Sequence, residues 1–206
     1  MTAALSPQEI YGITDDDLQK VRAELPEIDL LADPADQDRV AGVWASFMKA
    51  SSYGSIGEAP AFPGLPGYDL AGHTRQVVRN SLFLGDSMTE FWGIEYDREA
   101  LIAAALTHDS SKLVEREGPD GQESEIGGAL LHAQLAGVRV LEFGLSPKVA
   151  YLVTYHPFTP PHIHVQPKYN EFVILSWADI AAADTIFFHE DKPTHLDFRK
   201  RFFSLE

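Results

Sequence analysis

Three observations predict an all-α fold for this chain of 206 residues. Apolar residues recur at the spacing of a helix face in most segments after residue 69. Capping residues such as Thr, Asp or Ser-Pro stand directly before several of these segments. No convincing strand or internal repeat is visible, and a hydrophobic content of 45% is enough for a sizeable core. We predict one domain with an extended N-terminal segment.

The N-terminal segment, residues 1–68, predicts a helical extension followed by a loop. Thr14 and Asp17 resemble a capping box, with Asp in place of Glu, at the start of a helix over 15–24. A second helix over 36–50 follows from its apolar periodicity. The next stretch, SSYGSIGEAPAFPGLPG, is rich in Gly and Pro and has no period. A loop of this length before a histidine-bearing helix favours a functional role.

The rest of the chain, residues 69–206, predicts a helical bundle with a helical tail. Helices are expected over residues 70–88, 97–113, 126–143, 147–155 and 171–186. Asp97 can cap the second of these, Gly144 suits the position after the third, and Pro147 suits the first helical position of the fourth. The tail DKPTHLDFRKRFFSLE is amphipathic. Its phenylalanines could pack on the bundle or on a second subunit, so the sequence is compatible with a homo-oligomer.

Composition excludes several classes of function. A formal net charge of −15 opposes binding to nucleic acid polymers and to anionic membranes, whereas a small anionic substrate is compatible if bound cations invert the local field. There is no apolar run of about 18 residues and no signal-peptide pattern, so we expect no membrane span. The absence of cysteine excludes disulfides and thiolate metal sites. A cytoplasmic location is expected.

Histidines and aspartates on successive predicted helices form the candidate site. Asp109 and Asp179 follow the core-like runs ALIAAALTH and VILSWA, where a carboxylate is costly unless it is paired or binds metal. The candidate ligands are His73, His108, Asp109, His132, His156 and Asp179. The later intervals of 23 or 24 residues equal one helix and one connection, so each ligand can return to the same level of a bundle.

The ligand types indicate which metals are suitable. Imidazole and carboxylate without thiolate suit Fe, Mn, Co, Ni or Zn. Six protein ligands are more than one four-coordinate ion needs, so two divalent metal ions are expected, with a carboxylate bridging them.

The ordered set resembles the HD-domain superfamily. GHTRQVVRNSLFLG is similar to that family's first histidine helix, and ALIAAALTHDSSKL is similar to its HDxGK segment. HAQLAGVRVLEFGLSPKVAYLVTYHP resembles the stretch with two further histidines, and ILSWADIAAAD resembles the segment with the final aspartate. The resemblance covers residues 70–185. There are two departures: Ser111 stands in place of the glycine, and the GYP-type motif of cyclic-di-GMP phosphodiesterases does not follow His156.

The resemblance implies an HD-domain bundle with a dinuclear metal site at its centre. Asp109 would bridge the two ions. In that arrangement His73, His108 and Asp179 would hold the first ion, and His132 and His156 would hold the second.

The resemblance also implies a function. The commonest chemistry of the superfamily is metal-dependent phosphoester hydrolysis of a nucleotide or other small phosphate ester by a two-metal activated water. Asp109 and Lys112 are the expected catalytic residues, with Lys112 contacting an anionic group. One alternative is a mixed-valent diiron oxygenase of the myo-inositol oxygenase or organophosphonate oxygenase type. A second alternative is a non-catalytic HD domain that binds a ligand.

Four further residues are candidate substrate contacts. Tyr53 and Glu58 lie in the loop ahead of His73, where some oxygenases of this group carry a tyrosine and a glutamate that gate the iron. His162 and His164 follow His156 closely in PPHIHVQP and would lie near the metals if the resemblance holds.

Overall fold

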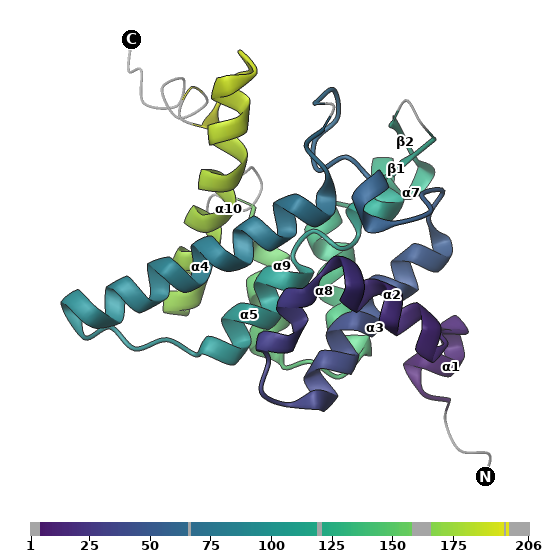
Figure 1. Ribbon diagram of the computed structural model, residues 1–206, viewed down its shortest axis with the longest axis horizontal. Helices are drawn as coiled ribbons and strands as arrows, with labels where there is room; N and C mark the ends of the chain where they lie inside the picture. Colours follow the sequence, from purple (N-terminus) through teal and green to yellow (C-terminus); the bar gives the residue numbers. More distant parts are fainter. Residues whose placement is uncertain (1–4, 66, 119–120, 158–165, 196, 198–206) are drawn as a thin grey trace.

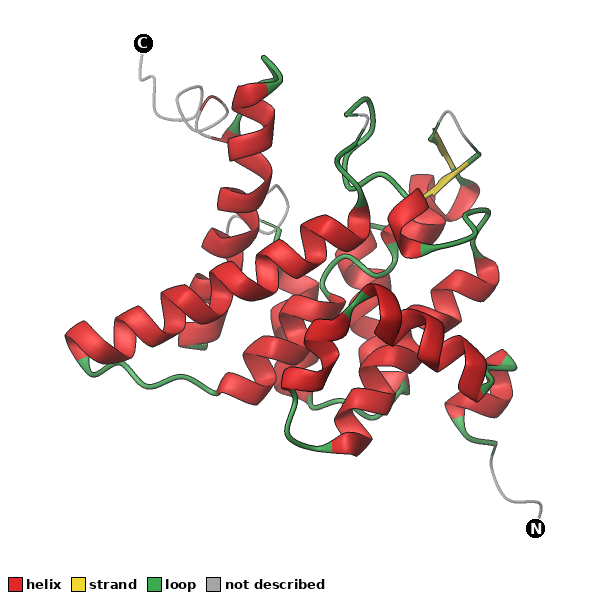
Figure 2. Ribbon diagram, in the orientation of Figure 1, coloured by secondary structure: helices red, strands yellow, loops and turns green. Residues whose placement is uncertain are grey.

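The computed structural model describes residues 5–65, 67–118, 121–157, 166–195 and 197. Helices dominate (Figure 2), which confirms the all-α prediction. The only strands among these residues are β1, Arg116–Glu117, and β2, Gln122–Glu123, which form a small antiparallel hairpin. The expectation of no strand was therefore wrong in this detail: Gly118 and Gly121, both at positive φ, allow the tight reversal between the two strands.

The N-terminal segment folds as short helices around one longer one. Its elements are α1 (Pro7–Tyr11), α2 (Asp15–Glu24), η1 (Pro26–Leu30), α3 (Pro34–Ala50) and η2 (Ile56–Glu58). The predicted capping box is present, because Asp17 N donates to the Thr14 hydroxyl at 3.3 Å and Thr14 N donates to the Asp17 carboxylate at 2.8 Å. Among the described residues of the predicted loop, only the single turn η2 is helical.

Seven helices make up the rest of the described chain. They are α4 (Leu70–Trp92), α5 (Arg98–Thr107), α6 (Lys112–Glu115), α7 (Glu125–Ala129), α8 (His132–Glu142), α9 (Pro147–Tyr155) and α10 (Asn170–His189). Figure 1 shows the long helix α4 crossing α10, with α5 and α9 in the middle of the molecule. α4 runs beyond the predicted residue 88 and ends before Gly93, whose φ of 64° suits a left-handed cap.

One hydrophobic core joins the two predicted segments of the chain. Trp44 of α3 is fully buried, and its indole Nε1 donates to the carbonyl of Leu106 in α5 at 2.7 Å. Val21 and Leu25, at the end of α2, belong to the same core cluster as Leu152 of α9. The N-terminal helices therefore form one wall of the bundle that carries the candidate ligands.

We predicted no membrane-spanning segment, but helix α10 passes a test for one. By length and composition it is apolar enough to cross a membrane, and half of its apolar window is buried within the protein. Its buried side chains, including Leu175 and Ala178, pack in the common core against α4, α5 and α9. A core helix of this kind has the same composition as a membrane span.

The predicted helix over 97–113 is broken. α5 ends at Thr107, residues 108–111 form turns, and α6 begins at Lys112. Tight bonds hold this bend, from Ser110 N to the Thr107 carbonyl at 3.2 Å and from Lys112 N to the Asp109 carbonyl at 3.0 Å. Neighbouring residues on a continuous helix point about 100° apart. The bend instead allows adjacent His108 and Asp109 to face one centre.

The predicted helix over 126–143 is broken as well. α7 and α8 are separated by Leu130 and Leu131, which are both extended. His132 is therefore the first residue of α8. The prediction that it lies inside a longer helix was wrong. Gly127 seats α7 against α6, since a Cβ at this position would lie 2.1 Å from the carbonyl oxygen of Glu115.

Gly127→Ala is expected to destabilise the fold by about 1–3 kcal/mol, the usual cost of overpacking. The atom that its methyl group would meet is backbone, so α6 and α7 would have to move apart. Gly128→Ala is the matched control, because its Cβ would meet the Glu123 carboxylate at an ordinary 3.5 Å. Urea unfolding of both variants tests this. Equal stability of the two variants would contradict the close packing of Gly127.

Candidate metal centre

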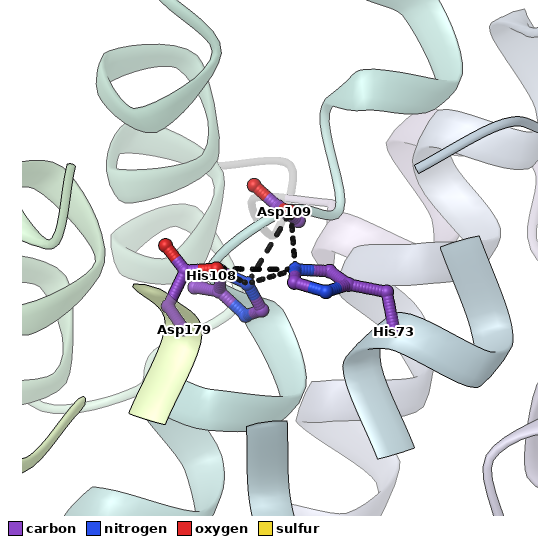
Figure 3. Close-up of side chains that lie close together, drawn as sticks. All are labelled: His73, His108, Asp109 and Asp179. Carbon is purple, nitrogen blue, oxygen red and sulfur yellow. Dashed lines mark hydrogen bonds and ion pairs between the residues drawn. The ribbon is translucent and has the colours of Figure 1, made fainter. Parts of the chain in front are cut away.

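The bundle brings all six predicted ligands to one centre. His73 lies in the first turn of α4, where the Asp69 side chain accepts from Gly72 N at 2.7 Å and caps the helix. The other ligands come from the bend after α5, the start of α8, the C-cap of α9 and the middle of α10, and they are His108, Asp109, His132, His156 and Asp179. Figure 3 shows four of these side chains pointing toward one another.

The first group of candidate ligands consists of His73, His108, Asp109 and Asp179. One donor atom of each lies within 4.8 Å of the others. His73 Nε2 lies 3.1 Å from Asp109 Oδ2 and 3.2 Å from Asp179 Oδ1 (Figure 3). His108 Nε2 lies 3.3 Å from both His73 Nε2 and Asp109 Oδ2. Four potential ligand atoms thus surround one small volume.

The second group consists of Asp109, His132 and His156, again with donor atoms within 4.8 Å. His132 Nε2 lies 3.4 Å from Asp109 Oδ1, and His156 Nε2 lies 3.7 Å from the same oxygen. Asp109 therefore belongs to both groups. It turns Oδ2 to the first group and Oδ1 to the second.

The outer nitrogens of the rings are held by other groups. His108 Nδ1 donates to the Ala105 carbonyl at 2.8 Å, and His156 Nδ1 donates to the Val153 carbonyl at 2.7 Å. A carbonyl only accepts, so each Nδ1 carries the proton and the Nε2 lone pair of a neutral ring faces the cluster. Contacts of this kind orient the imidazoles of metal sites.

The carboxylate of Asp109 has the environment of a cation ligand. The residue is 1% exposed, and its buried Oδ1 accepts no hydrogen bond from a described residue. The Lys112 ammonium makes an ion pair with Oδ2 at 2.7 Å, but Oδ1 faces only imidazole nitrogens. A buried carboxylate oxygen that no donor satisfies is costly, and a bound cation would remove that cost at Oδ1. The donor set thus fits a metal, and these buried His and Asp groups could hold one.

Ion pairing keeps the acids of the cluster charged. Burial opposes the charge of Asp109, but the nearby Lys112 ammonium favours it, and the pKa of Asp109 is held well below its usual range. Burial likewise opposes the charge of Asp179, whose pKa is nevertheless lowered, chiefly by the hydrogen bond from His73. For Lys112, the attraction of Asp109 and Asp179 exceeds the effect of burial, so its pKa is raised and it stays an ammonium.

The histidines separate into two kinds. Burial, reinforced by the nearby His108, lowers the pKa of His156 to about 3. Burial also lowers the pKa of His132. The pKa of His73 is raised, because its hydrogen bonds to Asp109 and Asp179 outweigh its burial. In the metal-free protein His132 and His156 are therefore neutral, while His73 takes up a proton more readily than a free histidine does.

We expect NMR titration of the imidazole nitrogens of the metal-free protein to find His156 neutral at pH 5 and His73 still charged above pH 6.5, the pKa of a free histidine. Between pH 6.5 and about 3 the unfolded chain binds a proton at His156 that the folded chain does not. The free energy of unfolding therefore decreases as the pH is lowered through this range. The His73 contribution has the opposite sign: it is full below pH 6.5 and is lost as the pH rises through the raised pKa. A midpoint near 6.5 for His156 would contradict this environment.

The predicted substrate contacts have different outcomes. Lys112 lies at the cluster, and its Nζ also donates to the Ala61 carbonyl at 3.1 Å. Tyr53 lines a cavity beside Lys112 and His132. Glu58 is exposed, and its carboxylate accepts from Gly54 N at 2.8 Å, so it takes no part in the cluster. The predicted residues His162 and His164 lie outside the described part of the chain.

Ser111, which stands where the HDxGK pattern has a glycine, makes a specific contact in the structure. Its φ of −78° is open to any residue, so the backbone does not require glycine here. Its hydroxyl donates to the His132 carbonyl at 2.6 Å and ties the bend after α5 to the start of α8.

Two neighbours of the cluster were not predicted from the sequence. The Tyr68 hydroxyl lies 2.7 Å from His73 Nδ1, and Glu115 Oε2 lies 3.9 Å from His132 Nδ1. Tyr68 stands directly after the predicted Gly- and Pro-rich loop, five residues before His73, and Glu115 lies between the predicted helices 97–113 and 126–143. Neither has a local signal, because each contact depends on how a loop folds onto a helix.

Comparisons with models of protein families, with curated proteins and with solved structures found no match for this chain.

Proposed function

We propose that this protein is an HD-domain metal-dependent phosphohydrolase that holds two divalent metal ions and acts on a small anionic phosphate ester. The observation that carries the proposal is the orientation of Asp109. One of its oxygens faces His73 and His108, and the other faces His132 and His156. A carboxylate placed in this way suits a bridge between two ions, with Asp179 completing the first group.

The chain's own residues would divide the work of such a site. Two bound divalent ions would supply Lewis acidity and a nucleophile derived from water. Lys112 would hold an anionic group of the substrate, because its ammonium stays charged and lies at the edge of the cluster. Solvent reaches the cluster at His132 and Asp179, whose side chains are 22% and 21% exposed. The side chains of His73 and His108 are only 0–3% exposed.

The oxygenase alternative requires the same six ligands. It is less well supported because Glu58, the expected partner of Tyr53 in gating an iron, is bound to Gly54 and exposed. A cytoplasmic location stays a prediction.

Metal content and hydrolysis test the proposal together. Protein purified without added metal is measured by mass spectrometry for metals, then stripped with a chelator and reloaded with Mn, Fe, Co, Ni or Zn. We expect two ions per chain and hydrolysis of small phosphate esters that is lost on stripping, restored on reloading and equal with and without O₂. Two irons that change oxidation state with O₂, without ester hydrolysis, would indicate the oxygenase. Full metal content without turnover would indicate a binding domain, and no metal after reloading would overturn the proposal.

A further inference from the structure

A small cavity adjoins the second group of candidate ligands. Its volume is about 170 Å³. The loop after α3 forms one wall, including Tyr53 and Phe62, and α6 and the following strand form the other. His132, a candidate ligand, also lines the cavity, which therefore adjoins the candidate metal centre.

The lining offers hydrogen-bond donors that have no partner. The Tyr53 hydroxyl is buried and makes no hydrogen bond with any described residue. Lys112 has three N–H donors. Two of them face Asp109 and the Ala61 carbonyl, which leaves one without a partner. Arg116 donates to the Gly121 carbonyl, and within the described ranges no carboxylate pairs with it. Unpaired donors are costly where they are buried and favourable where an anion can meet them.

The charges in the cavity also favour an anion. Two cations and one carboxylate line it, and the carboxylate of Glu115 lies 3.9 Å from His132 Nδ1. The lining therefore carries one more positive than negative side chain, and Arg116 is a cation that no described carboxylate pairs with, in a chain whose net charge is −15. A guanidinium presents paired donors that match phosphate oxygens.

We propose that this cavity binds the anionic group of a compact phosphorylated substrate, and that a nucleotide is too large for it. This inference rests on the proposed function. At about 170 Å³ the cavity is well below the roughly 300–1,000 Å³ of drug-sized sites. A phosphate group and a few carbon atoms fill it. Phe62 lines the cavity, and its ring packs against that of Phe187 in α10 with 4.6 Å between the ring centroids.

Tyr53 distinguishes this cavity from a neighbouring groove. Arg116 also lines a wider groove of about 570 Å³ between α3, α7 and α8, where Arg139 is already engaged by Ser46 at 2.6 Å and by Glu142 at 2.9 Å. Tyr53 lines the smaller cavity and not that groove. Loss of its hydroxyl therefore reports on the smaller cavity.

Calorimetric titration with inorganic phosphate tests the binding. The metal-loaded wild type is compared with Tyr53→Phe, Arg116→Gln and the control Tyr96→Phe. The control removes a hydroxyl that binds Asp86, about 20 Å along α4 from His73. We expect phosphate to bind about 10-fold more weakly to the first two variants, with unchanged metal content, because each loses a hydrogen bond to an anion. Equal affinity in all four proteins would overturn the proposed anion site.

A panel of substrates tests the size limit. We expect kcat/KM for methyl phosphate and glycerol phosphate to exceed that for nucleoside monophosphates, and KM for the small esters to rise in Arg116→Gln. Nucleotides turned over as well as small esters would overturn the size limit. Phosphate binding that depends on Tyr53 without hydrolysis of any ester would overturn the proposed function and leave the anion site standing.

Discussion

Asp109→Asn is expected to remove both metal ions and to abolish hydrolysis. Asp109 is the one ligand shared by the two groups, and an amide is a neutral, weaker donor than a carboxylate. Loss of a residue that only hydrogen-bonds to a metal ligand already lowers metal affinity about 10–100-fold. Loss of the shared ligand itself should therefore lower it about 1,000-fold or more. Metal content by mass spectrometry and turnover of a phosphate ester are the measurements.

The same substitution is expected to destabilise the fold, which could be mistaken for loss of the site. Asp109 is the main opposite charge of the Lys112 ammonium, and breaking a buried pair costs about 3 kcal/mol or more. The double variant Asp109→Asn with Lys112→Met removes both charges. It should recover stability in urea unfolding without recovering metal. That result separates ligation from folding.

Asp184→Asn is the matched control for Asp109→Asn. Asp184 also lies on the inner side of a helix, with 13% side-chain exposure, and its carboxylate lies 2.7 Å from His195 Nδ1, outside the six candidate ligands. It should retain full metal content and activity. An active, metal-bound Asp109→Asn protein would defeat the whole candidate centre.

His132→Ala has the second largest expected effect, and it is selective. His132 belongs to the second group alone, so metal content should fall from two ions per chain towards one. Activity should fall about 100-fold or more, because a two-metal mechanism needs both ions. Stability should change little, since the His132 side chain is 22% exposed and its lowered pKa keeps it neutral.

His189→Ala controls for the loss of any histidine. This residue lies at the end of α10 with 82% side-chain exposure and should leave metal content unchanged. His73→Ala gives the complementary result, because His73 belongs to the first group. Unchanged stoichiometry in His132→Ala would remove His132 from the site.

Local patterns predicted most helices, because helix formation depends on neighbours within one or two turns. The capping pair Thr14 and Asp17 and the N-terminal Pro147 of α9 occur where they were predicted. The convergence of Asp109 and Asp179 on the histidines followed from a similar argument. A carboxylate after a buried apolar run needs partners, and the repeated intervals place those partners at one level of the bundle.

The sequence by itself therefore determined the all-α class and the residues that could hold metal. Only the tertiary structure decided the bends at residues 108–111 and at Leu130–Leu131, which aim His108, Asp109 and His132 at one point. It also decided which loop residues reach the centre, bringing Tyr53 to the cavity beside Lys112 and leaving Glu58 exposed. The physical reason is that each bend gives up helical hydrogen bonds that local propensity favours. Contacts between segments distant in the sequence, such as Ser111 with His132 and Gly127 with Glu115, offset that loss.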